Sequence, residues 1–160
     1  MKIKLANVRL AFPELFEAKQ VNGEGKPAFS ASFLLEKGDK QNAAIEAAIN
    51  EVAKAKWGAK ADQILKQMKA GDKTALHDGD LKSQYAGFEG MNFVSARNPV
   101  RPLVIDRDKS PLAESDGKPY AGCYVNVSLE LWAQDNNFGK RINASLGGVC
   151  LLYTSPSPRD

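Results

Sequence analysis

The stretch YAGCYVNVSLELW, residues 120–132, alternates apolar and polar side chains with a period of two. Successive side chains of a β-strand point to opposite faces of the sheet, so the segment predicts a strand with one buried face. The residues expected to face the core are Cys123, Val125, Val127, Leu129 and Leu131. The residues expected to face solvent are Tyr124, Asn126, Ser128, Glu130 and Trp132. Two large aromatic rings on a solvent-facing surface can stack on flat ligands, of which nucleobases are the commonest.

Four other segments alternate in a similar way and predict strands over residues 2–12, 29–35, 91–97 and 140–146. In the first of them the apolar parity changes near residues 6–7, which predicts a β-bulge that bends the strand. Pro13 is expected to end this strand, because proline lacks a backbone N–H. The first two strands are expected to form a hairpin through a turn over residues 21–27.

Apolar residues between positions 45 and 52 recur at helical spacing. They predict a helix that starts after Asp39, an N-cap candidate, and ends near Lys56. A weaker helical pattern covers residues 60–69, and the segments 71–90 and 133–139 are polar and rich in turn residues. Five antiparallel strands with inserted helices indicate a mainly β (α+β) fold, namely a five-stranded antiparallel barrel of the OB-fold type. A β-sandwich is the alternative.

The composition is that of an ordinary globular domain, with 43% hydrophobic and 26% charged residues in a chain of 160. The net charge of +3 is compatible with a polyanionic partner and is too small to argue for one alone. We expect no membrane span and no secretory leader, and hence a location in the cytoplasm where the chain is made. The two cysteines lie apart from any Cys/His cluster, and no nucleotide-binding or hydrolase motif is present, so no cofactor is predicted.

The last eleven residues, CLLYTSPSPRD (150–160), resemble the translation of a transposon-derived sequencing adapter. We therefore expect one domain over residues 1–149, a chain interrupted after about Val149, and a foreign peptide over 150–160. The alternative is a flexible tail rich in Ser and Pro.

The outer faces of the predicted strands bring a candidate binding site together. Tyr124 and Trp132 lie about 26 Å apart along an ideal strand, and Arg141 is expected on the outer face of the neighbouring strand. Arg97 ends the third strand on its outer face. These four residues predict a groove in which rings stack on bases and arginines neutralise phosphates. The alternative is that the helices cover this face and bury the rings.

Two further groups of residues are basic. The loop between residues 97 and 120 carries Arg107 and Lys118 and ends at Tyr120, and it is either a flap over a bound strand or an ordinary polar loop. Trp57 lies among lysines at the end of the predicted helix, and we expect it to dock on the barrel beneath a solvated face.

The carboxylates suggest a second, weaker hypothesis. Asp78 and Asp80, with Asp106 and Asp108, could hold a divalent cation for phosphodiester cleavage, as in a metal-dependent nuclease. The same D-x-D spacing is common in turns, where aspartate accepts hydrogen bonds from nearby backbone, so no metal site is predicted. His77, the only histidine, is expected to be a surface or loop-anchoring residue.

Six segments, taken together, resemble a known family. They are VRLAFPELFE (8–17), LHDGD (76–80), GMNFVSAR (90–97), VIDRD (104–108), YAGCYVNV (120–127) and KRINASLGGV (140–149). Their order and spacing are similar to those of phage-encoded single-stranded DNA-binding proteins, a family long labelled as a domain of unknown function. The resemblance covers the chain from about Lys4 to Val149.

This resemblance implies an OB-fold that coats single-stranded DNA during phage replication or recombination in the infected bacterial host, without catalytic activity. It also implies an acidic C-terminal tail that recruits phage replication proteins, and no such tail is present in this sequence. The predicted DNA-binding residues, chosen from strand parity and the basic loop, are Tyr124, Trp132, Arg97, Arg141, Arg107, Tyr120 and Lys118. A protein-interaction module built on the same barrel remains an alternative function.

Overall fold

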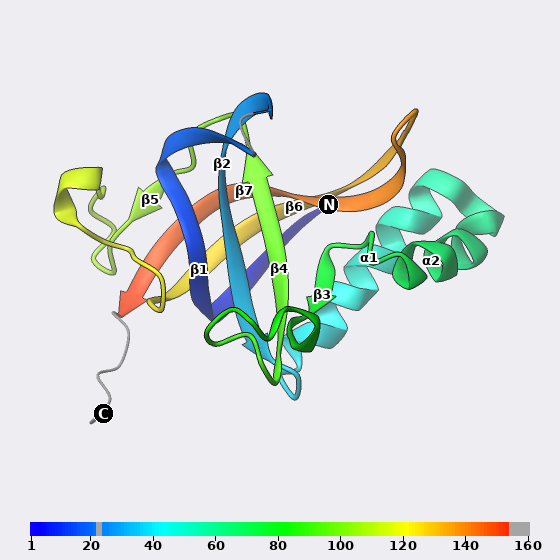
Figure 1. Cartoon of the computed structure of the whole chain (residues 1–160), viewed down its shortest axis with the longest axis horizontal. Helices are drawn as coiled ribbons and strands as arrows, with labels where there is room; N and C mark the ends of the chain where they lie inside the picture. Colours follow the sequence, from blue (N-terminus) through cyan, green and yellow to red (C-terminus); the bar gives the residue numbers. More distant parts are fainter. Residues whose placement is uncertain (22–23, 154–160) are drawn as a thin grey trace.

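A computed structural model of the chain describes residues 1–21 and 24–153. Five long strands form a barrel (Figure 1): β1 (Lys2–Val21), β2 (Glu24–Glu36), β4 (Met91–Asn98), β6 (Tyr124–Asn136) and β7 (Gly139–Tyr153). Around the barrel they follow the order β4-β2-β1-β6-β7, and a parallel pairing of Arg97 with Ser145 closes β7 onto β4. The other neighbours in this ring are antiparallel. The predicted mainly β fold with a five-stranded OB-type barrel is confirmed, with one parallel junction that the sequence pattern did not predict.

The alternation that predicted the central strand is present in the structure. Cys123, Val125, Val127, Leu129 and Leu131 are all buried in the main core, whereas Glu130 and Trp132 are exposed. The same core contains Phe33 of β2 and Ile142 of β7. The inner parity of these three strands was therefore assigned correctly.

The predicted bulge near residues 6–7 is confirmed. The register of β1 against β6 shifts between Leu5 and Val8, and Asn7 has a φ of +55°. Side chains satisfy the backbone groups that the bulge removes from the ladder. The N–H of Ala6 donates to Oε1 of Gln41 at 2.7 Å, and the N–H of Asn7 donates to Oδ1 of Asn126 at 2.9 Å.

Two predicted strand ends were wrong. Pro13 does not end β1, because a second register shift between Ala11 and Glu14 leaves its position outside the regular ladder. The turn predicted over 133–139 is shorter, since β6 continues to Asn136 and β7 begins at Gly139. The hairpin of β1 and β2 is confirmed, although residues 22–23 of its predicted turn lie outside the described residues.

The helices pack at one end of the barrel, next to the β6–β7 hairpin (Figure 1). Helix α1 (Gln41–Trp57) contributes Ile45, Ala48 and Ile49 to the main core, and α2 (Ala61–Ala70) contributes Leu65. The helix starts two residues after Asp39, whose Oδ1 accepts a hydrogen bond from the N–H of Gln41. Within residues 1–21 and 24–153, neither helix has the length and apolar content required to span a membrane.

Trp57 docks on the barrel, as predicted. Its indole N–H donates to Oδ2 of Asp135 on β6 at 3.0 Å, and this hydrogen bond is the largest cause of the lowered pKa of Asp135. The helices therefore pack on β6 near its end and leave the outer surface of β2, β4 and β7 open.

The polar segment 71–90 contains structure that its sequence did not predict. A short strand, β3 (Leu76–Asp78), pairs with β4, and a 3₁₀ turn follows over Gly79–Lys82. The loop then crosses the outside of the sheet and buries Phe88 against Ala11, Leu34 and Phe93. A second short strand, β5 (Val104–Ile105), pairs with β7 at the opposite edge.

Candidate nucleic-acid interface

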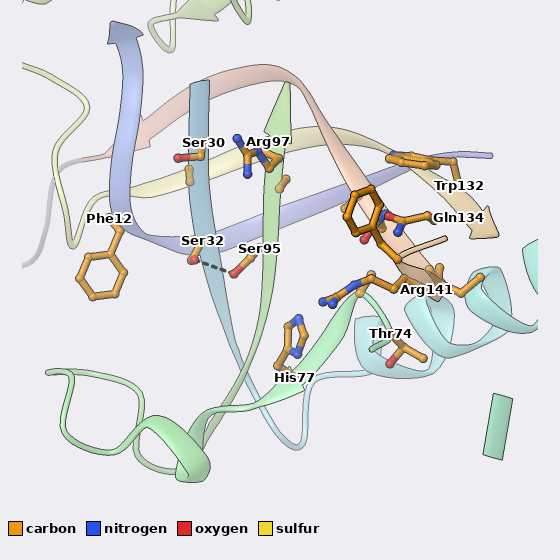
Figure 2. A pocket seen from close by; sticks show the side chains of 17 residues that line it. Phe12, Ser30, Ser32, Thr74, His77, Ser95, Arg97, Trp132, Gln134 and Arg141 are labelled. Atoms are coloured by element: carbon orange, nitrogen blue, oxygen red, sulfur yellow. Dashed lines mark hydrogen bonds between the residues drawn. The ribbon is translucent and has the colours of Figure 1, made fainter. Parts of the chain in front are cut away.

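An open groove with a volume of about 650 Å³ runs across the outer face of the barrel (Figure 2). Strands β2 and β4 supply its floor, and β6 and β7 supply one end with Trp132 and Arg141. Phe12 of β1 lies at the other end, and His77 of β3 lies along one side. The groove thus crosses several neighbouring strands instead of following one of them.

The floor of the groove consists of small side chains. Ser30 and Ser32 of β2 lie beside Ser95 of β4, and the hydroxyls of Ser32 and Ser95 are 2.9 Å apart in a hydrogen bond (Figure 2). Ala31 and Ala96 also line the groove at this floor. Side chains of this size allow a flat ligand to approach the sheet closely.

Aromatic rings lie at both ends of the groove. Trp132 is 43% exposed and Phe12 is 53% exposed, and Phe138 at the β6–β7 turn also lines the groove. Exposed rings of this kind are stacking platforms for bases. Sequence analysis predicted Trp132 but missed Phe12 and Phe138. Phe138 was predicted only to lie in a turn, where no repeat gives the direction of a side chain. Phe12 was missed because the bulge turns its side chain outward.

Arg97 and Arg141 supply the positive charge of the groove. Arg97 is exposed and donates a hydrogen bond to the carbonyl of Lys26 at 3.4 Å, while Arg141 is half-buried beside the floor. Among the described residues, neither guanidinium has a carboxylate partner within ion-pair distance, and no Asp or Glu lines the groove. Two guanidinium groups are therefore available for an anionic ligand.

His77 anchors its own loop and also borders the groove. Its Nδ1 is 2.7 Å from Oδ1 of Asp72, and its ring stacks on Phe93 with the centroids 5.0 Å apart. The loop-anchoring role predicted for His77 is confirmed, and its place beside the groove was not predicted.

The structure brings together only part of the predicted site. Trp132, Arg97 and Arg141 line the groove, and the other four predicted residues do not. Tyr124 stacks on Tyr153 with the ring centroids 4.9 Å apart, and Tyr153 belongs to the segment expected to be foreign. In the loop that follows β5, Lys118 pairs with Asp106 at 3.1 Å, and Arg107 and Tyr120 are exposed.

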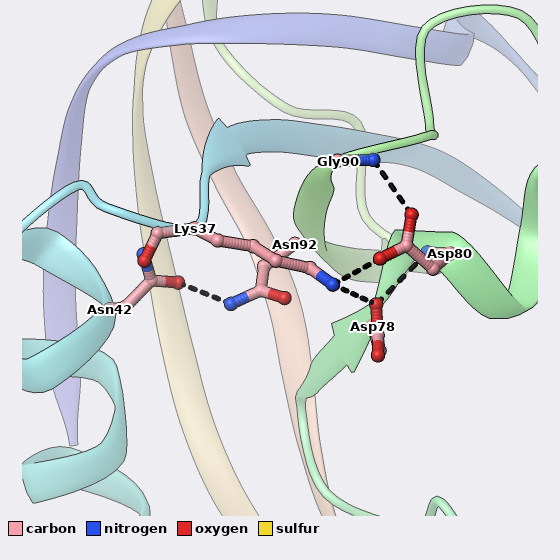
Figure 3. A network of polar contacts seen from close by, with 6 residues as sticks. All are labelled: Lys37, Asn42, Asp78, Asp80, Gly90 and Asn92. Atoms are coloured by element: carbon pink, nitrogen blue, oxygen red, sulfur yellow. Dashed lines mark hydrogen bonds and ion pairs between the residues drawn. The ribbon is translucent and has the colours of Figure 1, made fainter.

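The carboxylates of the nuclease hypothesis are engaged elsewhere. The ammonium of Lys37 contacts both Asp78, at 2.8 Å, and Asp80 (Figure 3). This lysine is the largest cause of the lowered pKa of both aspartates. The pKa of Asp106 is lowered chiefly by the backbone N–H of Arg107, and that of Asp108 by the hydroxyl of Ser110. In the part of the chain that the structure describes, no cluster of three His, Cys, Asp or Glu residues is placed to hold a metal ion.

The fold and the groove together define an OB-fold binding domain for an extended ligand that is flat in places and anionic. Stacking rings, a small floor and unpaired guanidinium groups can hold such a ligand.

The comparisons with known proteins agree with this class. Residues 1–154 match the family described as Enterobacter phage Enc34, ssDNA-binding protein, and the chain belongs to that family. A curated relative, putative protein p50 of Acyrthosiphon pisum secondary endosymbiont phage 1, is 49% identical over 152 residues, which are 93% of this chain and 82% of the relative. The predicted family is therefore confirmed.

Solved structures give the same result. The single-stranded DNA-binding protein from bacteriophage Enc34 in complex with ssDNA is similar with a TM-score of 0.84 and 27% identity, over 98% of this chain and 89% of that chain. The single-stranded DNA-binding protein gp2.5 encoded by bacteriophage T7 shares the fold, with a TM-score of 0.57 and 14% identity over 99% of this chain and 95% of that one. The family and the Enc34 neighbour are described as single-stranded DNA-binding proteins, which agrees with the prediction of a binding protein without catalytic activity.

Proposed function

We propose that the chain binds single-stranded DNA in the groove without sequence preference. Bases stack on Trp132 and Phe12, and phosphates lie against Arg97 and Arg141. The relative from phage Enc34 was solved in complex with ssDNA, which supports the ligand class for this chain. The observation that carries the proposal is a pair of arginines beside a floor of small residues, neither of which has a carboxylate partner among the described residues.

Each part of the site has a separate physical role in this proposal. Base–aromatic stacking contributes about 1–3 kcal/mol per base and tolerates every base, because each has a π-face. Phosphate contacts release counterions, so they give an affinity that falls with salt and carries no sequence information. The small side chains of the floor let bases lie close to the sheet.

The biological setting follows from the phage family. We infer that the protein coats single-stranded DNA during phage replication or recombination in the cytoplasm of the infected host. Phage replication proteins are the partners that the resemblance implies, through an acidic C-terminal tail. Arg107, Tyr120, Lys118 and Tyr124 stay candidates for contacts outside the groove. The domain over residues 1–149 and the foreign origin of residues 150–160 stay predictions, and β7 continues beyond this boundary to Tyr153.

Replacement of Trp132 by alanine tests the proposal. Fluorescence anisotropy with labelled oligo-dT of about 16 nucleotides, the upper site size of one OB-fold, should show an affinity loss of about 5- to 150-fold. Thermal unfolding is measured in parallel, because the residue is only 43% exposed and its truncation also removes packing.

Trp57→Phe is the matched control, since Trp57 docks on Asp135 outside the groove. It should keep the affinity of the unmodified chain. A folded Trp132→Ala protein that binds oligo-dT as tightly as the Trp57→Phe protein would remove the groove from the proposal.

A further inference from the structure

A second hollow, with a volume of about 290 Å³, lies beside the main groove, between Phe12 and the loop that carries Lys82 and Tyr85. Phe12, Ser32 and Ser95 line both this hollow and the main groove. The two depressions are therefore continuous, and Phe12 stands at the boundary between them.

Two exposed rings form the wall of this hollow. Phe12 meets Tyr85 edge to face, with the ring centroids 4.9 Å apart, and Tyr85 is 42% exposed. Both rings rest on the buried ring of Phe88, at centroid distances of 5.8 Å and 5.6 Å. Rings held in this way lose little side-chain freedom when a ligand stacks on them.

The backbone of Phe12 supports the same conclusion. Its φ of +48° lies in the left-handed region, which is uncommon for a bulky residue. Such conformations are costly and concentrate at ligand-binding sites. Here the result is a phenylalanine in a strand that faces solvent instead of the core.

The hollow is also basic. Lys82 lines it, no Asp or Glu does, and within the described residues Lys82 has no carboxylate partner. Rings beside an unpaired ammonium group reproduce, on a smaller scale, the chemistry of the main groove.

The loop that carries Tyr85 and Lys82 is held at its start by Lys37 and at its end by Asp80. Lys37 contacts Asp78 and Asp80, and the other oxygen of Asp80 accepts a hydrogen bond from the N–H of Gly90 at 2.8 Å (Figure 3). At the start of the loop, a Cβ on Gly79 would lie 2.2 Å from the carbonyl oxygen of Phe88, so only glycine fits there. The second hollow is thus built into the fold.

We propose that this hollow is a second stacking subsite, in which Phe12 and Tyr85 receive a base and Lys82 receives a phosphate of the same DNA strand. The inference rests on the proposed function and adds the path of the DNA. From Trp132 on β6 the DNA crosses β7, β4 and β2 to reach β1, which is four β-strand spacings or about 19 Å, and it ends over the loop. The DNA thus runs across the β-strands, whereas the sequence suggested a path along β6 from Trp132 to Tyr124.

Photo-crosslinking tests the path. Oligo-dT of about six nucleotides, the length that spans about 19 Å at about 3.4 Å per nucleotide, with one 5-iododeoxyuridine at either end is bound and irradiated, and the crosslinked peptides are identified by mass spectrometry. Substitution near one end should label Phe12 or Tyr85, and substitution near the other should label Trp132. Crosslinks to Trp132 without any to Phe12 or Tyr85, from either end, would overturn the second subsite and leave the proposed function in place.

Affinity gives an independent measure. Tyr85→Ala should weaken binding of the same oligonucleotide by about fivefold or more, and Tyr85→Phe should restore it, because stacking needs the ring and not the hydroxyl. Leu81→Ala is the control, since Leu81 is 68% exposed in the same loop and does not line the hollow. If Trp132→Ala loses affinity and Tyr85→Ala equals Leu81→Ala, the inference fails alone; if Trp132→Ala also loses none, the proposed function fails.

Discussion

Three serines decide how closely a ligand can approach the wall of the barrel. Ser30, Ser32 and Ser95 leave the outer face of β2 and β4 low between the rings of Trp132 and Phe12. The Ser32 and Ser95 hydroxyls share one hydrogen bond, which uses one of their two protons. A serine hydroxyl can donate to or accept from any base, so the floor is in keeping with binding that does not read sequence.

Ser95→Glu tests whether DNA lies over this floor. A carboxylate two residues before Arg97 repels phosphates and competes for the guanidinium group, so the affinity for oligo-dT should fall at least about tenfold, near 1.4 kcal/mol. Ser95→Thr keeps the hydroxyl and should bind nearly as the unmodified chain does. Equal affinities of the two variants, both with unchanged thermal unfolding, would contradict a DNA path over Ser95.

At this scale the sequence predicted the residues that follow ordinary strand alternation. Trp132, Arg97 and Arg141 lie outside the barrel as parity requires, and they meet in the groove. Phe12 was missed because the bulge between Ala11 and Glu14 reverses the parity that places neighbouring apolar residues inside. Tyr85 was missed because a loop has no period from which a direction can be read.

The loop between β3 and β4 depends on the ionisation of two aspartates. Asp78 and Asp80 have lowered pKa values, so their contacts with Lys37 are complete above the ordinary value of 3.8 and are lost as the pH falls through the lower values of the folded protein. The anchor is therefore intact at neutral pH and is released only in acid.

The amide of Gly90 reports this ionisation, because it donates to Oδ1 of Asp80. In an NMR titration its chemical shift should have a midpoint below 3.8, and Lys37→Met should move that midpoint upward, toward 3.8. The amide of Ser110, which donates to Asp108, is the internal control and should not respond to Lys37. A Gly90 midpoint that Lys37→Met leaves in place would mean that Lys37 does not hold the loop.

Elements were predicted well where their pattern was long. Strands β2, β4, β6 and β7 and helix α1 follow repeats of several residues, whereas β3 has three residues and no repeat. The end of β1 was misplaced because Pro13 excludes a ladder hydrogen bond only at a position that needs one, and the bulge removes that need.

For the whole molecule, the net charge of +3 does not describe the groove, because among the described residues its two arginines have no carboxylate partner, whereas five lysines elsewhere are paired. Arg97→Ala and Arg141→Ala should each reduce the slope of log affinity against log salt by about 0.7, the value for one phosphate of a single strand. Lys66→Ala, on the exposed face of α2, should leave the slope unchanged. Identical slopes for all three variants would exclude phosphate contacts from both arginines.

The barrel itself was predictable because five alternating segments with turns between them have few solutions. Which strands close the ring was not predictable from alternation, since parity gives the face of a residue and not the neighbour of its strand. The apolar stripe of α1 predicted that one face of the helix is buried. It did not predict which part of the barrel that face packs against.

The groove lies over the junction at which β7 closes the barrel onto β4. Among the described residues, β4 and β7 share one bridge, between Arg97 and Ser145, whereas the antiparallel neighbours share long ladders. The seam with the fewest cross-links therefore runs directly beneath the groove. On the proposed path, DNA crosses this seam and contacts β6 and β7 on one side and β4 and β1 on the other. Bound DNA should therefore stabilise the barrel against separation of β4 from β7.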